Sequence, residues 1–180
     1  MNILTIILFV IFVLIAFVLI ISLFLKQEYA VEREIIINKP IIEVFNYLKI
    51  LKNQDNFSKW ATMDPEMKKF YRGTDGQVGF VSSWESLNKN VGKGEQEILK
   101  IIENEIIDYE IRFIKPFKNI AAVYLITDLV TEHHTKVKWG FSSKMKYPMN
   151  FMLLFFNMEK FIGKDFEIGL SNLKEILEKN

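Results

Sequence analysis

An uncharged apolar run opens the chain. Residues 1–25 contain no Asp, Glu, Lys or Arg, and from Ile3 onward they are Ile, Leu, Val and Phe with only three interruptions. A helix rises about 1.5 Å per residue, so this run spans the roughly 30 Å hydrocarbon core of a bilayer. Inside lipid the backbone must satisfy its own polar groups, which a helix does. We therefore expect residues 1–25 to form one transmembrane anchor helix.

A cleaved secretory signal is the alternative for this run. Such a signal starts with positive residues, has a shorter apolar region and ends in small residues before the cut. The segment Leu25–Tyr29 offers no such site, so the sequence favours a retained single-pass anchor. No Lys or Arg precedes the run, whereas Lys26 and Arg33 follow it. Positive flanks tend to stay inside, which predicts a membrane protein with a cytoplasmic domain.

The remaining residues, 26–180, are enough for one ordinary domain with its own core. A formal net charge of +1 and the lack of a basic run interleaved with aromatics argue against a nucleic-acid partner. Cysteine is absent, which fits a reducing compartment and equally an export route without disulfides. Aromatic residues make up 14% of the chain and supply large apolar faces for a core or a pocket.

Strand and helix patterns follow in a definite order. Residues 29–37 end in three isoleucines and predict a strand, which Pro40 closes. The apolar spacing over residues 41–48 predicts a short helix, and residues 53–60 predict a second short helix or an ordered loop. Alternation and turn residues then predict six antiparallel strands, at 67–71, 78–86, 92–102, 106–113, 120–130 and 135–145.

The last segment predicts one long helix. It begins near Pro148 and would be roughly thirty residues, or about 45 Å, long. Gly163 and Gly169 lie inside it, and each costs up to about 1 kcal/mol relative to alanine. We expect a close backbone approach or room for a ligand to offset that loss. Its apolar stripe comprises Phe151, Leu154, Phe155, Met158, Ile162, Phe166, Leu173, Ile176 and Leu177.

This order resembles the START-like, helix-grip superfamily, which includes polyketide cyclase and dehydrase-like (SRPBCC) domains. The resemblance covers Tyr29 to the C-terminus and rests on the element order, the strand-then-proline entry at residues 35–45 and the late apolar helix. It implies an α+β fold in which a curved antiparallel sheet of about seven strands wraps the C-terminal helix, with two short helices after the first strand. It also implies a cavity between sheet and helix for an apolar ligand, without naming the ligand or any enzyme activity.

Strand parity and the helix stripe place eight candidate ligand-binding residues around that cavity. They are Phe80, Trp84, Tyr109, Ile111, Trp139, Phe141, Phe155 and Met158. Phe57, Trp60 and Met63 could line an opening. Three tryptophans, at 60, 84 and 139, are candidates for an aromatic wall, although tryptophan in small domains is usually core.

No residue pattern predicts catalysis, a metal site or a cofactor. The adjacent His133 and His134 lie in a predicted turn, where solvated side chains are expected, and no zinc, nucleophile-elbow or phosphate-loop motif is present. Glu85, Glu95 and Glu97 fall on neighbouring strands and could pair as acid and base. A solvated outer face with nearby lysines is the simpler interpretation.

Three function classes follow. The first is a membrane-anchored domain that binds a lipid or other hydrophobic small molecule in the cavity. The second is a cyclase or dehydrase-like enzyme, which needs a polar group inside that cavity. The third is a structural or regulatory partner domain with a filled core. An ionisable residue lining the cavity would separate the second class from the first, and a cavity would separate both from the third.

Overall fold

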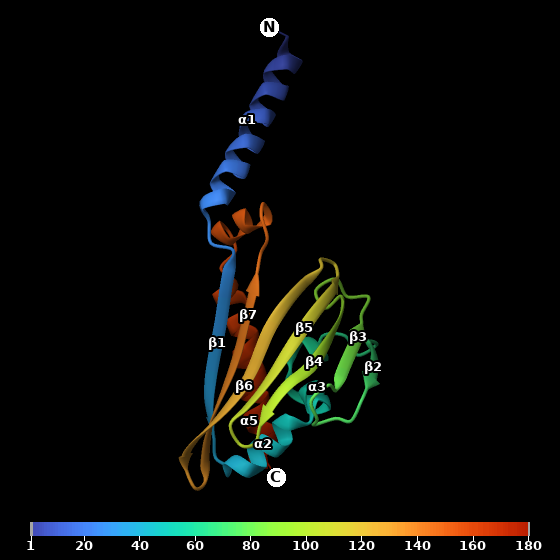
Figure 1. Ribbon diagram of the computed structural model, residues 1–180, viewed down its shortest axis with the longest axis vertical. Coiled ribbons are helices and arrows are strands. Elements are labelled where there is room, and N and C mark those ends of the chain that lie inside the picture. The colour runs from blue at the N-terminus through green and yellow to red at the C-terminus, as the bar shows by residue number, and fades with distance from the viewer. Residues whose placement is uncertain (1, 180) are drawn as a thin grey trace.

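The computed structural model describes residues 2–179, which form a seven-stranded antiparallel sheet curved around a long C-terminal helix (Figure 1). The predicted helix-grip fold is confirmed. The order across the sheet is β1-β7-β6-β5-β4-β3-β2. The strands are β1 (Glu28–Ile37), β2 (Lys68–Arg72), β3 (Val81–Glu85), β4 (Lys93–Ile102), β5 (Ile106–Lys115), β6 (Asn119–Thr131) and β7 (His134–Lys144).

The helices also follow the predicted order. Short helices and a 3-10 turn come after β1, as expected, and the apolar N-terminal run is a single helix of 22 residues. The helical elements are α1 (Ile3–Phe24), α2 (Ile41–Lys49), η1 (Leu51–Asn53), α3 (Gln54–Phe57), α4 (Lys59–Thr62), η2 (Met149–Leu154) and α5 (Met158–Lys179).

The C-terminal helix is shorter than predicted. The prediction of one helix from Pro148 is wrong, because η2 is a separate 3-10 segment and α5 begins only at Met158. The side chain of Asn157 accepts a hydrogen bond from the backbone N–H of Lys160 at 2.9 Å, the geometry of a helix N-cap. Phe155 therefore does not lie on the closing helix, where the sequence analysis placed it.

The core lies between the sheet and α5. On β5, Ile107 and Tyr109 point inward and are buried, while Asp108 and Glu110 alternate with them. The ring of Trp139 on β7 stacks on Phe166 of α5, with 4.4 Å between ring centroids. A Cβ atom at Gly169 would lie 2.8 Å from the Trp139 ring. The absence of a side chain at Gly169 therefore lets the backbone of α5 lie close to the sheet, which offsets the cost of a glycine inside a helix.

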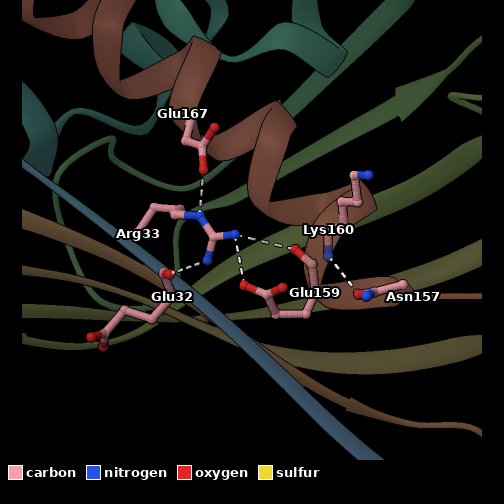
Figure 2. A network of polar contacts seen from close by, with 6 residues as sticks. All are labelled: Glu32, Arg33, Asn157, Glu159, Lys160 and Glu167. Carbon is pink, nitrogen blue, oxygen red and sulfur yellow. Dashed lines mark hydrogen bonds and ion pairs between the residues drawn. The ribbon is translucent and has the colours of Figure 1, made fainter.

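Arg33 of β1 lies across the first turns of α5 (Figure 2). Its guanidinium donates to Glu159 at 2.7 Å and to Glu167 at 2.6 Å. The hydrogen bonds that Arg33 donates to these two carboxylates, first to Glu167 and then to Glu159, raise the pKa of Arg33. Between them lies Gly163, and the three nearest neighbours of a Cβ atom built there all belong to the Arg33 side chain. The absence of a side chain at Gly163 thus makes room for an ion-pair network between β1 and α5.

Helix α1 extends away from the domain, and the two chain ends lie at opposite ends of the molecule (Figure 1). It is long and apolar enough to cross a membrane, and its most apolar stretch is not buried against the rest of the chain. Only three residues, 25–27, separate it from β1. The antiparallel topology places the start of β1, the end of β7 and the β5–β6 turn at the end of the sheet near α1, here called the proximal end.

The position of Arg33 above Gly163 predicts that alanine fails to stabilise the helix. In an exposed helix interior Gly163→Ala would stabilise by about 1 kcal/mol. Here the methyl group would displace the end of the flexible Arg33 side chain from Glu159 and Glu167. Exposed ion pairs of this kind contribute up to about 1 kcal/mol each, so their loss should offset the gain and leave the variant no more stable than the parent chain. Denaturant unfolding of the full chain in detergent, followed by circular dichroism, measures this.

Two controls make the result specific. Ser171→Ala changes an exposed position of the same helix and should move the free energy of unfolding by no more than about 0.5 kcal/mol. In an Arg33→Ala background the overlap is gone, so Gly163→Ala should become stabilising. A single Gly163→Ala variant that is more stable than the parent chain would contradict the packing described here.

Candidate ligand-binding site

Burial of the inner face changes along three neighbouring strands. Phe80, Ile98 and Tyr109, on or beside β3, β4 and β5, lie towards the distal end and are at most 1% exposed. Towards the proximal end the same faces carry half-buried side chains, Trp84 on β3, Gln96 on β4, and Ile111 and Phe113 on β5. The interior is therefore solid at the distal end and loosely covered at the proximal end.

The eight predicted site residues divide along this gradient. Phe80, Tyr109 and Trp139 belong to the closed core, and Phe141 is 9% exposed at its margin. Trp84, Ile111 and Met158 are half-buried near the proximal end. Phe155 is 71% exposed beyond η2 and lies outside the space between sheet and helix. The structure thus brings together only part of the predicted set.

Two open hollows lie at the proximal end. The smaller, of about 590 Å³, lies between the start of β1 and η2, and Tyr29, Phe155 and Met158 line it. The larger, of about 1310 Å³, lies over the proximal ends of β1, β5, β6 and β7. Inner-face residues Tyr29, Phe113 and Ser143 line it, together with outer-face residues and several lysines. Ligand sites in proteins are commonly about 300–1,000 Å³, so both hollows are large enough for a small molecule.

Tyr29 and Phe113 were missed by the sequence analysis. Phe113 shares the inner parity of Tyr109 and Ile111, so alternation alone could have included it. Its ring makes an edge contact with Trp84, with centroids 6.3 Å apart. Tyr29 contacts both hollows and packs against Phe141 at 6.0 Å, and burial raises the pKa of its hydroxyl. No signal in the sequence indicated that Tyr29, near the start of β1, would line a cavity.

The middle of the domain is closed by α3 and α4. Phe57 is fully buried, and Trp60 makes edge contacts with Trp139 and Phe166 instead of lining an opening. Met63 is only half-buried. The buried carboxylate of Asp165 on α5 pairs with Lys59 of α4, which fastens this cover to the helix. An unpaired carboxylate at that depth would be costly, so the ion pair belongs to the scaffold.

The three glutamates considered for acid–base chemistry lie on the outer face. Glu85 pairs with Lys93 at 3.0 Å. Arg112 binds the other two, and its hydrogen bonds to Glu97, Glu110 and Glu95 raise its pKa. The N–O distances are 2.6, 2.7 and 2.6 Å, respectively. The expected solvated face is confirmed, with Arg112 as the main partner of these carboxylates.

Another polar cluster lies at the β2 edge of the inner face. Tyr71 stacks on Phe80 and donates to Asp55 at 3.2 Å, and Lys69 pairs with the same carboxylate at 2.9 Å. Burial, with Asp55 as the second cause, raises the pKa of Tyr71 to about 12. Each charge has its partner within the cluster, which suits a structural role. Within residues 2–179 no group of three or more His, Cys, Asp or Glu side chains is arranged to hold a metal ion.

Solved structures share this fold at low sequence identity. Norcoclaurine synthase from Thalictrum flavum, solved with dopamine and hydroxybenzaldehyde, has a TM-score of 0.65 at 9% identity and covers 89% of this chain and 92% of its own. A Thermus thermophilus protein has a TM-score of 0.58 at 17% identity over 84% and 98% of the two chains. The Aha1 dimer from Colwellia psychrerythraea gives 0.57 at 14% identity over 83% and 96%. At such identities the likeness shows the fold alone.

Sequence comparison gives the family. A search of curated proteins finds no match. The family described as polyketide cyclase / dehydrase and lipid transport matches residues 29–178, which is the whole sheet and nearly all of α5. The element order, the fold and this match agree, and the chain belongs to the polyketide cyclase/dehydrase and lipid-transport family.

Proposed function

We propose that this protein is a membrane-anchored domain that binds a lipid or another hydrophobic small molecule at the proximal end of its sheet. Residues 1–25 would serve as the anchor and residues 26–180 as the binding domain. The ligand would enter at the two hollows, beside Tyr29, Phe113 and Met158, and would reach the half-buried inner faces of Trp84 and Ile111. Membership of a family whose description includes lipid transport supports this class of ligand.

The burial gradient is the observation that carries the proposal. A partner domain with a filled core has no reason to leave aromatic and aliphatic inner-face residues half-exposed on adjacent strands. Burying one such side chain fully is worth about 1.5–3 kcal/mol, so an apolar ligand that covers several of them gains affinity. The same face is closed at Phe80 and Tyr109, which limits the proposed site to the proximal half.

An enzyme of the cyclase or dehydrase kind receives less support from the arrangement. Such chemistry needs a polar group in contact with the ligand. The glutamates on β3 and β4 face outward and are ion-paired, and the Asp55 cluster pairs its own charges. The polar side chains near the proposed site, Gln96, Tyr29 and Ser143, could orient a ligand, and ligand binding is the function that the geometry favours.

The anchor supports the proposal by position. Helix α1 has the length and hydropathy of a membrane span, and both hollows lie at the end of the domain that adjoins it. A membrane ligand would have a short path from the bilayer to the site. Lys26, which closely follows the helix end, is consistent with a domain on the cytoplasmic side.

Replacing Ile111 with Trp tests the site. The larger ring should fill the half-covered space, so binding of an apolar fluorescent probe or of extracted lipid should fall strongly. Because Ile111 is only half-buried, the free energy of unfolding should drop by less than the roughly 1–3 kcal/mol that overpacking a core costs. Probe titration and denaturant unfolding on the same preparations measure the two effects.

Ile107→Trp is the matched control. This residue lies on the same strand and face but is 1% exposed in the closed core. The substitution should destabilise the fold by the full overpacking cost. Should Ile111→Trp destabilise the chain as much as Ile107→Trp and leave binding of every probe unchanged, the interior is solid at both places and the partner-domain class is preferred.

Alkaline carbonate extraction of cell membranes tests the anchor. The full chain should stay in the pellet, because about twenty apolar residues in lipid resist extraction. A variant that starts at Lys26 should appear in the supernatant and unfold in one cooperative transition, since the faces of its sheet and α5 cover one another. Recovery of the full chain in the supernatant would refute the anchor. Non-cooperative unfolding of the shortened variant would refute the separate domain.

A further inference from the structure

We propose that the proximal end of the domain is a docking surface for the bilayer that α1 crosses, with η2 and Phe155–Phe156 in the interfacial layer and nearby lysines on anionic lipid headgroups. This inference rests on the proposed anchor. It goes further in assigning a second lipid contact, made by the folded domain itself. The surface consists of residues 149–156 and the lysines at 26, 118, 144 and 146, and is called the proximal surface below.

A direct contact fixes this surface against the end of α1. Asn150 of η2 is completely buried, and its amide donates to the carbonyls of Ser22 at 2.8 Å and Leu25 at 3.2 Å. The Ser22 hydroxyl donates to the Val18 carbonyl within α1 at 2.7 Å and lies 3.2 Å from the Pro148 carbonyl. Backbone carbonyls at a helix C-terminus lack partners within the helix, so Asn150 supplies a cap from a distant part of the chain. These hydrogen bonds join η2 of the domain to the end of the anchor helix.

The apolar side chains of this surface have no cover within the described residues, 2–179. Phe155 is 71% exposed, Phe156 56%, Leu154 55% and Met149 49%. Contiguous exposure of large apolar side chains marks contact with a membrane or a partner. We assign this contact to the membrane, because η2 caps the C-terminal end of α1, where that helix would leave the bilayer. Residues in contact with that helix end lie at headgroup depth, where interfacial segments bury the apolar side chains of Phe and Leu in the headgroup and acyl boundary.

The charged residues around the proximal surface also fit contact with a membrane. Lys26, Lys118, Lys144 and Lys146 line the larger hollow beside it, together with the acidic residue Glu28, which pairs with Lys144 at 2.6 Å. Four lysines against one glutamate give the rim of this hollow a local positive charge. At the distal end, by contrast, Glu103 is paired with Lys49 at 2.9 Å. Anionic headgroups attract such basic groups close to the surface.

The absence of cysteine makes the proposal directly measurable by site-directed spin labelling of the full chain. Single variants Phe155→Cys, His133→Cys and Leu14→Cys carry a nitroxide on the proximal surface, on the distal β6–β7 turn and in the middle of α1. Each is reconstituted into phosphatidylcholine vesicles, without and with phosphatidylglycerol. Accessibility to oxygen, which concentrates in lipid, and to a water-soluble nickel chelate gives the depth of each label.

The proposal predicts that the label at 155 is lipid-exposed and shielded from nickel, and that the label at 133 stays in water. It also predicts that phosphatidylglycerol shifts position 155 deeper and that Lys144→Gln with Lys146→Gln abolishes this shift. The pair Lys136→Gln with Lys138→Gln, on β7 but away from the proximal end, should leave it unchanged.

A water-exposed label at 155 together with a lipid-exposed label at 14 overturns the docking surface and leaves the anchor intact. Water exposure at both positions overturns the anchor as well. A depth at 155 that is identical in the two kinds of vesicle overturns the assignment of the lysines to anionic headgroups. Self-association that shields position 155 from both reagents, seen as spin–spin broadening, would assign the surface to a second copy of this chain and overturn the proposal.

Discussion

The close approach of α5 to the sheet is the constraint on which the rest of the structure depends. Two glycines permit it, Gly163 beneath the Arg33 guanidinium and Gly169 against the Trp139 ring. At Gly169 a side chain would meet the Trp139 ring, which stacks on Phe166 in the distal core, whereas at Gly163 it would displace the Arg33 side chain from its ion pairs. The glycines thus allow α5 to lie close to the sheet. The looser cover at the proximal end is then a property of the side chains there.

Most of the fold could be predicted from the sequence because its signals are local. Alternation on β5 and β7, the proline after β1 and the apolar run of α1 each depend on neighbouring residues, and all were confirmed. The break before α5 was missed although Asn157 gives a helix-cap signal, because the apolar spacing continues across it from Phe151 to Met158. Both glycines could be noted as costly, but only the fold shows which side chains lie above them.

The candidate site was harder to predict for the same reason. Parity gives the inner face of a strand but not how far along that face the core closes, so Phe80 and Trp84 looked equivalent in sequence and differ in burial. The roles of Arg33 and Asn150 depend on partners more than a hundred residues away. An apolar helix end, a half-covered inner face and a basic rim lie at one end of a domain that belongs to the polyketide cyclase/dehydrase and lipid-transport family.

Native mass spectrometry of the full chain, released from membranes in a mild detergent, tests the central claim most directly. The account predicts a population carrying one additional mass equal to a single lipid or hydrophobic metabolite, which persists at collision energies that remove all detergent and is identical in two different detergents. Fragmentation of that complex would identify the bound molecule. A spectrum that shows only the mass of the chain once detergent is removed, or added masses that change with the detergent, would contradict the claim that the domain holds a hydrophobic ligand.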